Sequence, residues 1–72
     1  MDNKLDREYF RTKYPVFIRE MALNAVISWG LSVRVPASDL ISETIAGIVN
    51  DFIKDLANAD YETRRAVIKK WL

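Results

Sequence analysis

Residues 15–31 read PVFIREMALNAVISWGL, and this segment is the most apolar part of the 72-residue chain. At 3.6 residues per turn, only Glu20, Asn24 and Ser28 form a continuous polar stripe, and Arg19 lies off to one side. A surface helix normally has one apolar and one polar face, so a helix that is apolar on nearly every side must be covered on nearly every side. We therefore expect a second copy of the chain, or another protein, to help cover this helix.

The ends of this helix are marked by residues that favour helix termini. Pro15 suits the first helical turn, and Tyr14, the residue before it, is disfavoured in the helical region. Gly30 is the expected left-handed terminator. The pattern predicts a helix from Pro15 to about Trp29, preceded by a helix from about Asn3 to Lys13 whose cap is Asp2 or Asn3.

The helical period breaks over residues 31–38, LSVRVPAS. Val33 and Val35 are β-branched and alternate around Arg34, a pattern typical of a short extended segment, which Pro36 ends. The period then returns, and we expect a third helix from Leu40 to Leu56 with Ser38 or Asp39 as its cap. Its apolar arc consists of Ile41, Ile45, Ile48, Val49, Phe52 and Leu56, and its polar side includes Glu43, Asn50 and Lys54.

A fourth helix is predicted from Tyr61 to the C-terminus, with Asp60 as its cap. Arg64 falls inside its apolar arc, where the alkyl stem packs while the guanidinium reaches water. Trp71 is expected to dock the last turn onto the rest of the protein.

The expected fold is all-α: one helical domain, residues 1–72, arranged as a small four-helix bundle with an extended joint between its second and third helices. A single core of this size rarely provides more than about 3–5 kcal/mol of stability. The chain has no Cys and no His, which removes disulfides and the common zinc sites. Oligomerisation remains as the stabilising device, and we expect a homodimer.

Charge indicates no general attraction to nucleic acid or anionic lipid, because the net charge is only +1. Locally, residues 39–56 carry four acidic side chains and one lysine, whereas residues 61–72 carry four basic side chains and one glutamate. We expect these two helices to attract each other weakly through their polar faces. No signal peptide or membrane-spanning stretch is apparent, so a cytoplasmic protein without membrane contact is expected.

Catalytic chemistry has little support in this composition. Histidine and activated cysteine are missing, and the two glycines stand apart, so no phosphate-binding loop is present. The carboxylate pairs Asp39 with Glu43 and Asp51 with Asp55 have helical spacing and are expected to be solvated. We therefore expect no enzyme, no cofactor and no metal site.

The excess apolar surface instead favours a small regulatory or inhibitory protein that binds another protein and acts as a homodimer, as many small phage and bacterial regulators do. Self-association is expected to use the side of the second helix that carries Trp29. We expect this tryptophan to lie in the core or the dimer core, and the alternative is a half-exposed indole beside the helix terminator that anchors a partner. The candidate self-association residues are Met21, Ala22, Ala25, Val26 and Trp29.

Binding to DNA or RNA is the alternative. The segment Ser32 to Pro36, followed by two helices, resembles the ribbon-helix-helix repressors. The resemblance covers roughly the last forty residues, and it implies a strand that pairs with its copy in a dimer. Ser32 and Arg34 would then face the DNA major groove, and Val33 and Val35 would face inward. The sequence departs from this family in its long helix after the strand, in the missing glycine-containing turn between the two helices, and in the apolar helix before the strand.

The basic side chains of the fourth helix offer a second route to nucleic acid or to an acidic protein surface, and the sequence does not separate these partners. On a helical projection they do not share one face. They are Arg64, Arg65, Lys69 and Lys70.

Overall fold

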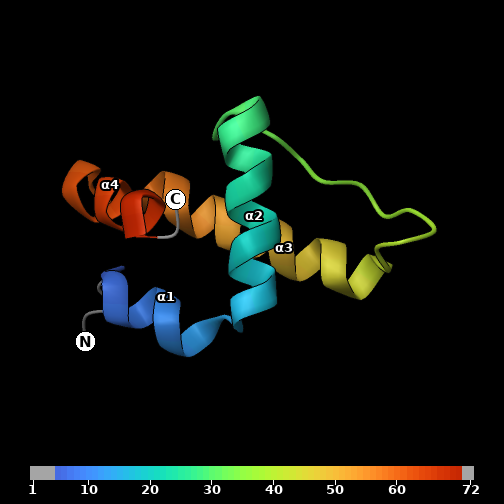
Figure 1. Cartoon of the computed structure of the whole chain (residues 1–72), viewed down its shortest axis with the longest axis horizontal. Coiled ribbons are helices and arrows are strands. Elements are labelled where there is room, and N and C mark those ends of the chain that lie inside the picture. Colours follow the sequence, from blue (N-terminus) through green and yellow to red (C-terminus); the bar gives the residue numbers. More distant parts are fainter. Residues whose placement is uncertain (1–4, 71–72) are drawn as a thin grey trace.

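The computed structural model describes residues 5–70, with side chains through residue 69. Four helices follow one another in this part of the chain, and it contains no strand (Figure 1), so the all-α class is confirmed. α2 lies across α3 and packs on it, and α1 lies near α4. The helices are α1 (Arg7–Lys13), α2 (Val16–Trp29), α3 (Glu43–Asn58) and α4 (Tyr61–Lys70).

α1 begins later than the sequence pattern predicts. Leu5 and Asp6 are not helical, and the Asp6 carboxylate accepts a hydrogen bond from the Tyr9 backbone N–H at 2.9 Å, so Asp6 is the cap. The predicted caps Asp2 and Asn3 lie outside the described residues. The helix ends as expected at Tyr14, whose backbone is extended before Pro15.

α2 begins one residue after the predicted start and ends where the sequence indicates. Pro15 is its N-terminal cap residue, and Gly30 ends it with a φ of 96°. Arg19, which the helical projection leaves to one side, is buried at 8% exposure. Its Nη1 donates to the backbone carbonyls of Tyr14 at 2.6 Å and Arg11 at 3.0 Å, two acceptors that the end of α1 leaves open. Arg19 thus fixes the turn between α1 and α2.

The predicted start of α3 is wrong by three residues. Ser42 is the cap, with its Oγ accepting from the Ile45 N–H at 3.2 Å, and Leu40 lies before the helix. Ser38, one of the two predicted caps, instead accepts from the N–H groups of Leu40 and Ile41 at 3.2 Å each. Ser42 directly precedes the helix and provides the better cap, whereas Ser38 forms a local turn.

Residues 31–42, here called the strap, connect α2 to α3 along one side of the molecule (Figure 1). The predicted alternation is confirmed, because Val33 and Val35 are half-buried whereas Ser32 and Arg34 are exposed. No strand forms, since the pairing partner is a side chain. The Asn50 amide accepts from the Val35 N–H and donates to the Val35 carbonyl, both at 2.8 Å.

α4 has the predicted cap, since the Asp60 carboxylate accepts from the Thr63 N–H at 2.7 Å. Arg64 is half-buried, as expected for a packed stem, and its Nη1 donates to the Ala59 carbonyl at 3.0 Å and to the Ala57 carbonyl at 3.4 Å. Its head therefore binds the end of α3 rather than only water. The predicted docking of Trp71 lies outside the described residues.

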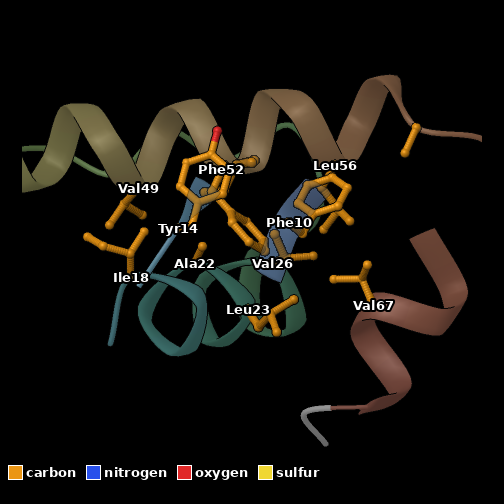
Figure 2. Close-up of a cluster of buried hydrophobic side chains, with 12 residues drawn as sticks. Phe10, Tyr14, Ile18, Ala22, Leu23, Val26, Val49, Phe52, Leu56 and Val67 are labelled. Carbon is orange, nitrogen blue, oxygen red and sulfur yellow. The ribbon is translucent and has the colours of Figure 1, made fainter. Parts of the chain in front are cut away.

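One face of each helix contributes side chains to the hydrophobic core (Figure 2). Phe52 of α3 is at its centre, with ring centroids 5.2 Å from Phe10 and 4.9 Å from Tyr14. Such edge-on aromatic pairs contribute about 0.5–1.5 kcal/mol beyond the area they bury. The remaining labelled core side chains are Ile18, Ala22, Leu23, Val26, Val49, Leu56 and Val67.

α2 is only partly covered by its own chain. Ile18, Ala22 and Leu23 are buried, but four of its large apolar side chains stay more than half exposed. These exposed side chains are Val16, Phe17, Ile27 and Trp29. Within residues 5–70, no helix has both the length and the apolar character that crossing a bilayer requires.

Candidate functional site

A hollow of about 610 Å³ lies between α2, the strap and α3, and we call it the α2 groove. Its lining is mainly apolar, and Asn24 and Arg34 are its polar members. Small-molecule and peptide sites commonly have this composition, with a few polar groups around an apolar surface. The apolar lining consists of Met21, Ala25, Trp29, Val33, Val35, Pro36, Ile41 and Val49.

The groove exists because α2 is apolar on two sides. One side, including Ala22 and Val26, enters the core, and the neighbouring positions Met21, Ala25 and Trp29 face the groove. Trp29 is the last residue of α2, and it lines the groove while remaining 76% exposed. The strap forms the opposite wall.

The structure separates the five predicted self-association residues into two groups. Met21, Ala25 and Trp29 line the α2 groove together. Ala22 and Val26 must be removed from the set, because they are 0% and 7% exposed and pack inside the chain's own core. The helical projection placed all five side by side, but α3 occupies the part of that face nearest to Ala22 and Val26.

Two regions carry the predicted basic residues. Arg34 is exposed at the edge of the α2 groove. On α4, the side chains of Arg64, Arg65 and Lys69 line a second hollow of about 300 Å³ together with Tyr61 and Ile68, which we call the α4 hollow. Three of these cations therefore line one hollow, although the helical projection does not place all four on one face. The Lys70 side chain lies outside the described part of the chain.

The strap has the inward and outward side-chain alternation that the ribbon-helix-helix resemblance implies. Val33 and Val35 face inward and Ser32 and Arg34 outward, as the resemblance implies. In that family the strand backbone pairs with its copy. Here the N–H and carbonyl of Val35 are already bonded to Asn50.

Asp55 was expected to be a solvated carboxylate, and the structure corrects this. Its Oδ2 accepts hydrogen bonds from the hydroxyls of Tyr14 at 2.6 Å and Tyr9 at 2.8 Å. Lys13 lies 3.3 Å from the same oxygen and donates to the Tyr9 hydroxyl at 2.8 Å. This cluster of four side chains, which we call the Asp55 cluster, fastens α1 and the turn that follows it to α3.

The protonation of the cluster follows from these contacts. Burial raises the pKa of Tyr14, and its hydrogen bond to the Asp55 carboxylate raises that pKa further. Burial acts to raise the pKa of Asp55, but the hydrogen bonds from Tyr14, Tyr9 and Lys13 outweigh it and hold the pKa below its ordinary value of 3.8. The pKa of Lys13 is raised, chiefly by its bond to the Tyr9 hydroxyl. Tyr14 thus remains a donor and Asp55 remains ionised, which suits an anchor rather than a nucleophile.

The sequence carries a partial signal for the roles of Arg19 and Asp55. A lone arginine in an otherwise apolar helix, four residues after a proline, indicates a buried partner for Arg19. Asp55 lies at the edge of the apolar arc of α3, but its tyrosine partners are more than forty residues away. Pattern alone does not pair them. Among the residues the structure describes, no group of three His, Cys, Asp or Glu side chains is arranged to hold a metal ion.

The α2 groove and the α4 hollow are therefore the two candidate binding sites. No protein-family model, curated protein or solved structure matches this chain.

Proposed function

We propose that this chain is a small, non-enzymatic, regulatory or inhibitory protein-binding module that acts as a homodimer through the α2 groove. The observation that carries the proposal is an open apolar groove whose lining includes a largely exposed tryptophan. Tryptophan and arginine are enriched among the residues that dominate binding energy, and Trp29 and Arg34 both lie at this site.

The energetics favour covering the groove. Burying apolar surface yields about 25 cal/mol per Å², and Trp29, Met21 and Ile41 all offer surface that the chain leaves in water. A chain of this size has a small core of its own and no cysteine for a disulfide. Contact with a second copy adds stability without any new chemistry.

The test compares two substitutions on one helix. Ala25→Glu places a carboxylate in the α2 groove, whereas Ser28→Glu adds the same charge on the polar stripe outside it. We expect the wild type and Ser28→Glu to sediment as dimers at high micromolar concentration and Ala25→Glu to sediment as a folded monomer. Circular dichroism verifies the helix content of each.

Two results would contradict this function. One is a wild type that stays monomeric and folded throughout the concentration range. The other is an Ala25→Glu variant that dimerises as well as the wild type, because the groove would then lie outside the interface.

Nucleic-acid binding is the second candidate, and the grouping of three cations in the α4 hollow favours it. Phosphate contacts by Arg65 and Lys69 require an affinity that falls steeply with added salt. An electrophoretic shift assay at low salt with duplex and single-stranded probes tests this function. Retardation that Arg65→Glu abolishes supports it, and no retardation at high protein concentration excludes it.

A further inference from the structure

Leu40 is the most exposed large apolar side chain in the described part of the molecule, at 95% exposure. Its neighbour Ile41 is half-buried and lines the α2 groove. The exposed leucine therefore directly precedes a residue of the groove lining, just before the start of α3.

Leu40 is held in this position by a defined turn. The Ser38 Oγ accepts from the N–H groups of Leu40 and Ile41, and the Ser38 N–H donates to the Ile41 carbonyl at 2.8 Å. These bonds fold residues 38–41 back on themselves. Because the turn is already formed, inserting the leucine into a partner loses little conformational entropy.

Opposite charges lie beside the leucine and the groove. Asp39 precedes Leu40 and is exposed, and Arg34 is exposed at the groove edge. Within residues 5–70, neither side chain forms an ion pair. Each copy therefore offers one acidic and one basic side chain. A two-fold axis that places Asp39 of one chain against Arg34 of the other lets the two form an ion pair.

We propose that the occupant of the α2 groove is a second copy of this chain, which inserts Leu40 beside Trp29 and Ala25 while its Asp39 meets Arg34. A two-fold interface uses the same patch on both subunits, so a patch that carries both a protrusion and a cavity provides the two halves that such an interface needs. The inference rests on the proposed function and specifies which residues make the dimer.

The first test removes the protruding side chain. Leu40→Ser leaves the fold unchanged, because this side chain touches almost nothing within its own chain. Sedimentation velocity should show a dimer dissociation constant raised about tenfold or more, as expected when a leucine is no longer buried. Val16→Ser is the matched control, since Val16 is exposed on α2 but does not line the groove, and it should leave the constant unchanged.

The second test exchanges the charges. Arg34→Asp and Asp39→Arg should each weaken the dimer about threefold to tenfold, because each leaves two like charges facing each other. The double substitution should restore the dissociation constant to within about twofold of the wild type. Added salt should shrink the differences among all four proteins.

The outcomes separate this inference from the function on which it rests. A wild type that never dimerises overturns both. A wild type that dimerises, loses dimerisation in Ala25→Glu, but is unaffected by Leu40→Ser and is not rescued by the double charge exchange overturns only the insertion of Leu40.

Discussion

Asp55 accepts hydrogen bonds from two tyrosines and lies against a lysine, and all three partners come from α1 and the turn that follows it. α1 has only seven residues, too short to be stable as an isolated helix. Its position on α3 therefore depends on a few side chains: the ring of Phe10, the ring of Tyr14 and the Asp55 cluster.

Asp55→Asn tests this dependence. The change keeps the shape of the side chain but removes the charge that organises three donors, so we expect the free energy of unfolding at neutral pH to fall by about 1–3 kcal/mol. Urea denaturation followed by circular dichroism measures it. Asp51→Asn, an exposed position on the same helix, should change stability by less than about 0.5 kcal/mol.

The pH dependence of the same pair has a definite sign. The pKa of Asp55 in the folded state lies below its ordinary value of 3.8, so its contribution is fully present above that value and is lost as pH falls through the folded pKa. The difference in stability between the wild type and Asp55→Asn should therefore shrink progressively as pH falls below 3.8. A difference in stability that stays constant from pH 7 to strongly acidic pH would show that Asp55 does not act through its charge.

The two glycines occupy different positions relative to the helices. Gly30 ends α2 with φ 96° and ψ 173°, a backbone region open essentially only to glycine. Gly47 lies within α3, with space where a Cβ would be added. The same substitution should therefore have opposite effects at the two positions.

We expect Gly30→Ala to lower the free energy of unfolding by about 1–3 kcal/mol and Gly47→Ala to raise it by about 1 kcal/mol. Thermal unfolding followed by circular dichroism measures both variants. An unchanged or raised free energy of unfolding in Gly30→Ala would mean that α2 does not end at Gly30 as described.

The position of the strap on α3 depends on the two hydrogen bonds between the Asn50 side chain and the Val35 backbone. Asn50→Ala removes both hydrogen bonds to Val35, so the Val35 amide should exchange with solvent much faster and global stability should fall by about 1–2 kcal/mol. Hydrogen exchange followed by NMR measures the Val35 rate. An unchanged rate in Asn50→Ala would contradict the description, and Asn58→Ala, at the exposed end of α3, is the control expected to leave the rate unchanged.

Most helix ends and the buried face of α3 could be predicted from the sequence, because they depend on residues within one segment. Pro15, Gly30 and Asp60 mark termini through their own backbone or side-chain preferences, and the arc from Ile45 to Leu56 identifies the buried face of α3. The start of α3 was misplaced because Ser38 and Ser42 both suit a cap. The bonds of Arg19, Asn50 and Asp55 join different elements, and no periodicity in one segment reports them.

At the scale of the whole molecule, the chain buries one side of α2 and leaves the other side open. The apolar character of residues 15–31 predicts that part of this helix stays uncovered by the chain, and some of the uncovered surface lies at the groove lined by Met21, Ala25 and Trp29. Which of these neighbouring positions enter the core depends on how α2 crosses α3, and that crossing is not written in either helix alone.

The emission of Trp29 as a function of protein concentration tests the cover of the α2 groove most directly. In a Trp71→Phe variant, Trp29 is the sole tryptophan, and it is 76% exposed in the single chain. The account predicts that its emission shifts to shorter wavelength, and becomes harder to quench with acrylamide, as concentration rises through the dimer dissociation constant. An emission that stays at the wavelength of a solvated indole while the protein dimerises, or in a protein that never dimerises, would contradict it.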